Sequence, residues 1–183
     1  ALAISLNHRI SYDIDIFFQD VKALKLLSPN KNRKIRNLSD NWQQPGHYLK
    51  IERPDGDIDF LVTRTFTENP FFLYEFGKKK VPVETPAEII AKKIYYRNSK
   101  FTIRDIFDLT AFSEQEPDAL SWLPPDIREA VPKILNRIKL LRKRYEKTIY
   151  QTVFPTESGK RFMENGADIA IRTLEALNIE SEK

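Results

Sequence analysis

The 183-residue chain contains no cysteine, and this absence excludes disulfide bonds, thiolate chemistry and cysteine-based zinc sites. It also has no low-complexity tract and no run of about 20 apolar residues, which is the length that a membrane-spanning helix needs. Hydrophobic residues make up 41% of the chain and aromatic residues 11%, enough for a sizeable core. We therefore expect a soluble, cytoplasmic protein with one domain, or with one domain and a small appendage.

The basic residues are unevenly placed along a chain whose formal net charge is +4. They gather in three clusters, within residues 31–36, 78–80 and 133–147. A mildly positive protein favours polyanionic partners, although a solvated surface is the simpler interpretation of any single cluster.

The front of the chain mixes predicted strands and helices, and the back is all helical. Strands are expected at residues 13–18, 48–53, 57–63, 71–76 and 81–83, and helices at 1–6, 19–27, 86–99, 102–112, 126–141 and 159–177. Pro132 should kink or split its helix, and Thr85 with Glu88 should form a capping box. This segregation predicts an α+β fold, with a mixed core over residues 1–83 and a helical region over 84–183.

Two carboxylates stand two residues apart in the segment ISYDIDIFF, residues 10–18. On a strand Asp13 and Asp15 share one face, while Ile14 and Ile16 point into the core. Adjacent carboxylates repel each other, and oxygen ligands suit a hard cation such as Mg²⁺. The alternative is an edge strand whose polar face is simply in water.

A predicted hairpin carries a second pair of carboxylates, Asp57 and Asp59, after the turn at residues 54–56. If its strand pairs beside residues 13–18, Asp59 or Asp57 joins the first two carboxylates on one face. Three such carboxylates suit a two-metal site for phosphoryl or nucleotidyl transfer. Asp59 is the better candidate, because it alternates with apolar neighbours and Asp57 lies near the turn. A solvent-facing hairpin is the alternative.

The helical region adds charged residues at helical spacing. Lys93 and Arg97 fall on one helix face, and Arg104, Asp105 and Asp108 begin the next helix. A cation beside a triphosphate neutralises the leaving group. The alternative is an ion-pair network that ties the two helices together, which is the more natural role for Asp105.

These motifs resemble a known family. The segment ALAISLNHRISYDIDIFF looks like the signature of the AbiEii/AbiGii-type nucleotidyltransferase toxins, a MenT-like group within the DNA polymerase beta-like nucleotidyltransferase superfamily. The matching positions are Ala1, Leu2, Ala3, His8, Arg9, Ser11, Asp13 and Asp15. The segments GDIDFL, VETPAEIIAKKI and RDIFDL also resemble family motifs in the right order, and they place Asp59, Lys93, Arg104, Asp105 and Asp108. The resemblance spans about residues 1–112.

The resemblance implies a minimal nucleotidyltransferase fold. It also implies Mg²⁺-dependent transfer of a nucleoside monophosphate from an NTP to an acceptor, such as the 3′ end of tRNA. A protein of this kind acts as the toxin of a toxin–antitoxin or phage-defence pair, with a cognate antitoxin as partner and no membrane. The implied catalytic residues are Asp13, Asp15, Asp59, Lys93 and Asp108. The first three are the implied metal ligands, and the implied nucleotide-binding residues are Arg9, Ser11, Lys93 and Arg104.

In the family a Gly-Gly-Ser/Thr turn that grips the nucleotide phosphates precedes the position of Ala1. The sequence begins just after that position, so we expect residues upstream of Ala1 to be missing from this chain. Two other hypotheses stay open. One is a catalytically weak protein of the same fold that holds nucleic acid or a partner with its basic tail, and the other is an interaction module without nucleotide chemistry. His8 is expected to be structural.

Overall fold

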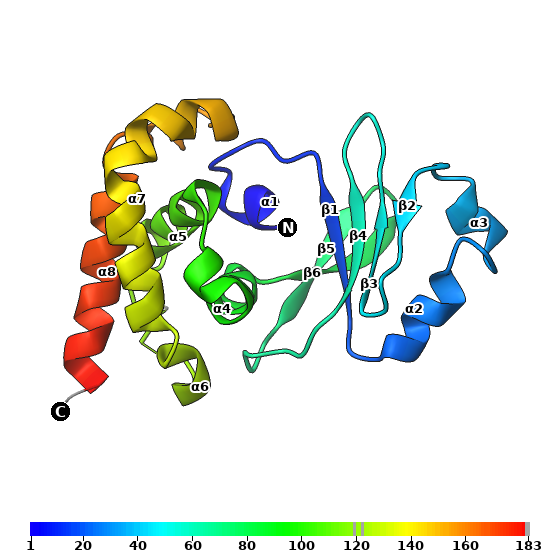
Figure 1. Ribbon diagram of the computed structural model, residues 1–183, viewed down its shortest axis with the longest axis horizontal. Coiled ribbons are helices and arrows are strands. Elements are labelled where there is room, and N and C mark those ends of the chain that lie inside the picture. The colour runs from blue at the N-terminus through cyan, green and yellow to red at the C-terminus, as the bar shows by residue number, and fades with distance from the viewer. Residues whose placement is uncertain (119, 122, 182–183) are drawn as a thin grey trace. The chain divides into compact units, whose positions relative to one another are not determined.

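The computed structural model describes residues 1–118, 120–121 and 123–181 (Figure 1). The strands are β1 (Ile14–Phe18), β2 (Trp42–Gln43), β3 (Tyr48–Ile51), β4 (Ile58–Val62), β5 (Phe71–Phe76) and β6 (Lys79–Glu84). The α-helices are α1 (Leu2–Leu6), α2 (Val21–Leu27), α3 (Arg33–Arg36), α4 (Pro86–Arg97), α5 (Ile103–Gln115), α6 (Pro125–Arg128), α7 (Val131–Thr152) and α8 (Gly166–Ser181). Short 3₁₀ helices occur at η1 (Asn98–Lys100) and η2 (Lys160–Phe162). The protein is thus a mixed α+β protein with small sheets and a helical C-terminal region. None of the described helices is long and apolar enough to cross a membrane.

The chain divides into two compact units. One contains residues 11–65, and the other contains residues 1–10 together with 66–183. These limits differ from the 83/84 boundary expected from the change of strand to helix. The reason is that α1 packs on α4 and α5, and that the β5–β6 hairpin belongs with the helices.

The smaller unit is built on a four-stranded sheet with the order β1-β4-β3-β2. Strand β1 runs parallel to β4, and the other neighbours are antiparallel. One face of this sheet is apolar, since Leu49, Ile51 and Phe60 are buried there with Leu24 of α2. Side chains alternate along a strand, so the residues between these positions belong to the opposite, polar face.

A glycine fixes the turn that leads into β4. Gly56 has a φ of 130°, which L-residues rarely adopt, and a Cβ there would lie 2.2 Å from the carbonyl oxygen of Tyr12. Nearby, the backbone N–H of Ile14 donates to the carbonyl of Asp57 at 2.9 Å. The close approach of the two segments therefore requires glycine and aligns the starts of β1 and β4.

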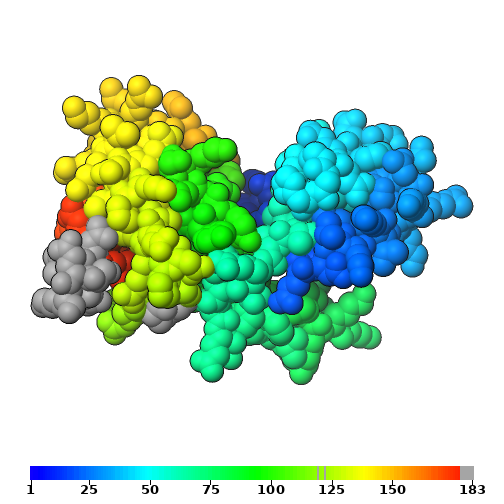
Figure 2. Space-filling view, turned by 60° about the horizontal axis from the view of Figure 1, so that its bottom comes forward, coloured from blue at the N-terminus to red at the C-terminus, as the bar shows by residue number. Residues whose placement is uncertain are grey.

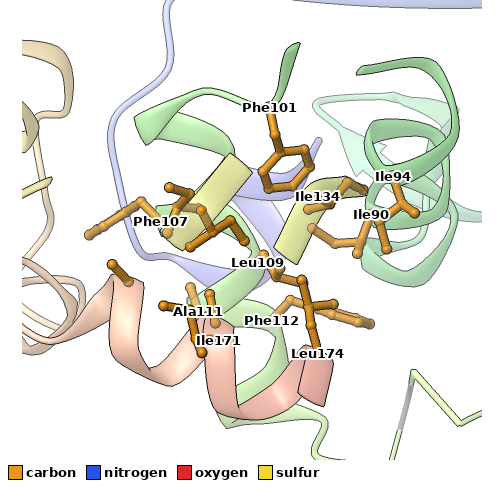
Figure 3. Close-up of a cluster of buried hydrophobic side chains, with 14 of the residues drawn as sticks. Ile90, Ile94, Phe101, Phe107, Leu109, Ala111, Phe112, Ile134, Ile171 and Leu174 are labelled. Carbon is orange, nitrogen blue, oxygen red and sulfur yellow. The ribbon is translucent and has the colours of Figure 1, made fainter. Parts of the chain in front are cut away.

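The larger unit has its core between α4, α5, α7 and α8. Figure 3 shows this cluster, in which Phe107, Leu109 and Phe112 of α5 lie among apolar side chains from the other helices. Helix α5 is almost wholly buried over its length, which makes it the central helix of the unit. Its start is fixed by a capping box between Thr102 and Asp105.

The capping box expected at α4 is only half formed. Thr85 accepts a hydrogen bond from the backbone N–H of Glu88, as expected. The Glu88 carboxylate does not return to the cap, because it is fully buried and accepts hydrogen bonds from Phe66 N at 3.0 Å and from Thr67 N at 2.9 Å. Glu88 therefore anchors the segment before β5 instead of capping its own helix.

Two helix boundaries show the effect of proline and of packing. Pro132 lies in the first turn of α7, so the expected split between α6 and α7 is confirmed. The last helix begins at Gly166 and not at residue 159, because residues 160–162 form a 3₁₀ turn. A Cβ at Gly166 would lie 2.2 Å from the hydroxyl of Tyr145, so α8 starts in close contact with α7.

Candidate functional site

The polar face of the small sheet brings two predicted aspartates together. Asp15 on β1 is the register partner of Asp59 on the neighbouring β4. Asp13 immediately precedes β1, and its Oδ1 accepts a hydrogen bond from the backbone N–H of Asp57 at 3.2 Å. The hairpin strand does pair beside β1, which was the condition for Asp59 to join the first pair of carboxylates, and Asp59 lies in register with Asp15.

Lys50 completes this row of residues across the sheet. It lies on β3 opposite Asp59, and its Nζ is 2.5 Å from Asp57 Oδ2 and 3.7 Å from Asp59 Oδ1. Its carboxylate neighbours raise the pKa of Lys50, the hydrogen bond to Asp57 having the largest effect. The Lys50 ammonium is therefore the cation that compensates this acidic face, and sequence reasoning missed it. The hairpin register about the turn was the signal that could have revealed it.

The carboxylates of this face affect one another. Burial raises the pKa of Asp59, the charges of Asp15, Asp57 and Asp13 raise it further, and the nearby Lys50 opposes them. Asp57, in contrast, has a lowered pKa, chiefly because it accepts a hydrogen bond from Lys50. Asp59 thus binds a proton more readily than an ordinary aspartate, and Asp57 less readily.

The polar side of the sheet that carries Asp13, Asp15, Asp57 and Asp59, which we call the aspartate face, provides donor atoms that suit Mg²⁺. Among the described residues no group of three or more carboxylate, histidine or cysteine side chains is arranged to hold a metal ion. Mg²⁺, however, commonly uses one or two protein carboxylates, with substrate phosphates and water as its other ligands. Asp15 and Asp59, in register on neighbouring strands, meet that smaller requirement.

Asp108, on α5 in the larger unit, is the centre of a buried ionic network. Its side chain is fully buried. Oδ1 accepts from His8 Nε2 at 2.7 Å and from Arg9 Nε at 2.6 Å, while Oδ2 accepts from Lys93 Nζ at 2.7 Å and from a terminal nitrogen of Arg9 at 3.1 Å. Burial alone would raise the pKa of Asp108, but these donors lower it well below its ordinary value.

Asp105 extends the network by one turn of α5. Its Oδ1 accepts from Lys93 Nζ at 2.7 Å, and its Oδ2 accepts from Arg97 at 2.9 Å and from both the N–H and the hydroxyl of Thr102. Burial opposes ionisation here too, but Lys93 and Arg97 lower the pKa of Asp105 below its ordinary value. The alternative of an ion-pair network between the helices is therefore what the structure shows for Asp105, and Lys93 belongs to it as well.

The remaining predicted residues differ in how far they are buried. Ser11 is exposed in the loop before β1, and Arg104 is exposed in the first turn of α5. His8 is fully buried, and its ring stacks on Phe107 with centroids 5.5 Å apart. The expectation that Ile14 points into the core is wrong. Ile14 is 55% exposed, because it opens the edge strand β1, whereas Ile16 packs against the core.

Comparison of the chain with protein-family models, with curated proteins and with solved structures finds no match. The function is therefore inferred from the residues of the chain itself and from the resemblance of its motifs.

Proposed function

We propose that this protein is a Mg²⁺-dependent nucleotidyltransferase of the AbiEii/AbiGii toxin type. It would transfer a nucleoside monophosphate from an NTP to an acceptor, for which RNA such as the 3′ end of tRNA is the best candidate. The observation that carries the proposal is the in-register pair Asp15 and Asp59 on parallel strands, with Asp13 beside them. The ordered motifs that resemble the family support the same reaction, and a small mixed sheet is compatible with a minimal nucleotidyltransferase fold.

The proposed roles follow from charge and protonation. Asp15 and Asp59 would hold Mg²⁺, with Asp13 as the third ligand that the resemblance implies, and the ion would supply positive charge to the reacting phosphate. Asp59, whose pKa is raised in the metal-free protein, would either complete the metal site or accept the proton of the acceptor hydroxyl.

Lys93 is the proposed triphosphate contact. An ammonium has three N–H donors, and Asp105 and Asp108 accept two of them. One donor is left for a phosphate oxygen. Asp108 would orient the ammonium, and His8 and Arg9 fix the position of Asp108 by hydrogen bonds. Arg9, Ser11 and Arg104 are the further proposed nucleotide contacts.

The direct test supplies the complete gene product with Mg²⁺, each α-labelled NTP in turn and total tRNA. The matched variants are Asp13→Asn/Asp15→Asn, which removes two charges of the aspartate face, and Asp40→Asn, which changes an exposed aspartate elsewhere in the same unit. We expect label on RNA with the unmodified protein and with Asp40→Asn, and none with the double variant. Transfer that survives in the double variant would refute the proposal, as would the absence of transfer to RNA and to protein acceptors with every NTP.

The second candidate is a catalytically weak binding protein of the same fold. The observation that favours it is that Lys50 already compensates Asp57 and Asp59, so the acidic face does not need a metal ion for neutrality. Mn²⁺ binding, followed by electron paramagnetic resonance, separates the two functions. Binding that is lost in Asp13→Asn/Asp15→Asn supports the transferase, and no binding by the unmodified protein in the presence of an NTP supports the weak binder.

A further inference from the structure

Helix α7 carries a straight row of cations on one exposed side. Lys133, Arg137, Arg144 and Lys147 have the spacing i, i+4, i+11 and i+14, which places them within about 80° of the helix circumference and along about 21 Å of its length. We call these four residues the α7 stripe. Lys133, Arg144 and Lys147 are exposed, and Arg137 is partly buried because its Nε donates to the Phe101 carbonyl at 3.2 Å. Figure 2 shows the surface of α7 in yellow.

The stripe differs from two neighbouring cations of the same helix. Lys139 pairs with Glu175 of α8 at 2.7 Å, and Arg142 pairs with Asp168 of α8 at 2.6 Å, so these two cations bridge α7 and α8 at the surface. No residue of the stripe forms an ion pair within the part of the chain that the structure describes. Glu146, the one acidic residue of α7, lies about 140° around the helix from the stripe. The positive charge of the stripe is therefore available to a partner.

The apolar side of α7, opposite the stripe, excludes a membrane surface as the partner. Its apolar residues Ile134, Ile138 and Ile149 are fully buried in the core of the unit. A membrane-surface helix must place its apolar face in the lipid, which α7 cannot do while the unit is folded. A row of four cations, three of them exposed and none paired with an acidic residue in the described part of the chain, suits a chain of phosphates, which repeats one negative charge per nucleotide.

We propose that the α7 stripe binds the phosphate backbone of RNA. This inference rests on the proposed function, because an RNA acceptor is what a nucleotidyltransferase of this type would need to hold. Contacts to phosphates position an RNA without reading its sequence, so the stripe would contribute affinity and not base specificity.

The experiment measures binding of fluorescently labelled oligo(U) by anisotropy as a function of salt. The variant is Lys133→Glu/Arg144→Glu/Lys147→Glu. If each lost cation removes one phosphate contact, the slope of log affinity against log salt should fall by about 2, at roughly 0.7 per contact for single strands. Affinity at about 50 mM salt should fall at least about tenfold.

The matched control is Lys22→Glu/Lys31→Glu/Lys34→Glu, which makes the same change in net charge at exposed positions of the other unit. Circular dichroism and thermal unfolding establish that both triple variants fold. Unchanged oligo(U) affinity in the folded stripe variant would overturn the proposal, and so would an equal loss in both triple variants.

The variant Asp13→Asn/Asp15→Asn distinguishes RNA binding by the α7 stripe from the proposed nucleotidyl transfer. It should bind oligo(U) like the unmodified protein while losing transfer. If the unmodified protein transfers no nucleotide, and only the stripe variant loses affinity for oligo(U), the proposed reaction is refuted and the proposed RNA-binding surface is supported.

Discussion

Replacing Asp108 by asparagine tests whether the buried network stabilises the fold. Asn keeps the shape of the side chain but removes its charge. Oδ2 of Asp108 accepts hydrogen bonds from Lys93 and Arg9, and an amide NH₂ in its place would point its own N–H groups at these donors. Asp108 is fully buried, and removing one partner of a buried ionic contact costs about 3–5 kcal/mol. We therefore expect Asp108→Asn to lower the free energy of unfolding by this amount in urea titrations at pH 7.

The pH dependence of the same experiment gives an independent check. Because the pKa of Asp108 is lowered in the folded protein, its contribution is complete above the unfolded-state pKa of about 3.9 and declines as the pH falls below that value. The stability difference between the two proteins should thus be constant from pH 7 to about pH 5 and shrink at lower pH. The control is Asp168→Asn, whose partly exposed pair with Arg142 should contribute less than about 1 kcal/mol. A loss for Asp108→Asn no larger than that of the control would refute the reasoning.

Three further changes test other parts of the structure. Lys50→Met removes the cation that would compete with a metal ion for the aspartate face. Mn²⁺ should therefore bind up to about fivefold more tightly in a calorimetric titration, and weaker binding would contradict the competing role of Lys50. Gly56→Ala places a Cβ against the Tyr12 carbonyl and should cost about 1–3 kcal/mol more in thermal unfolding than Gly46→Ala, where φ is also positive but space is open; equal costs would contradict the clash. Glu88→Gln removes the charge from a buried acceptor of several hydrogen bonds and should destabilise the protein by about 1.5–3 kcal/mol in urea, whereas a neutral result would show that these bonds contribute little.

The aspartate face was predictable because its information is local. Alternation along β1 and β4 puts Asp13 with Asp15, and Asp57 with Asp59, on common faces, and the turn at Gly56 marks the hairpin. The sequence left the pairing of β1 with β4 as a condition, because no local pattern tells which strands become neighbours. Ile14 was misjudged because alternation gives the face of a residue but not whether anything covers that face.

The buried network was less accessible to sequence reasoning. The spacing of Asp105 and Asp108 places them on one side of α5, but their partners come from α4 and from residues 8 and 9, about 100 residues away in the chain. The helix start at Gly166 was missed for a similar reason. Residues 160–162 form a 3₁₀ turn, and Gly166 lies against Tyr145 of α7, a contact between helices that the sequence does not reveal.

The hydrogen bonds of Lys93 decide how its stabilising role could coexist with the triphosphate contact that we propose for it. If a phosphate displaced the ammonium from Asp105, that buried carboxylate would keep Arg97 and two donors of Thr102. If it displaced the ammonium from Asp108, Oδ2 would keep only the 3.1 Å bond from Arg9. Breaking either hydrogen bond would cost stability. A phosphate that binds the third N–H of the ammonium breaks neither of them. If Lys93 is the triphosphate contact that we propose, phosphate should therefore bind with the network intact, and the carboxylates that stabilise the helices would also fix the direction in which Lys93 donates.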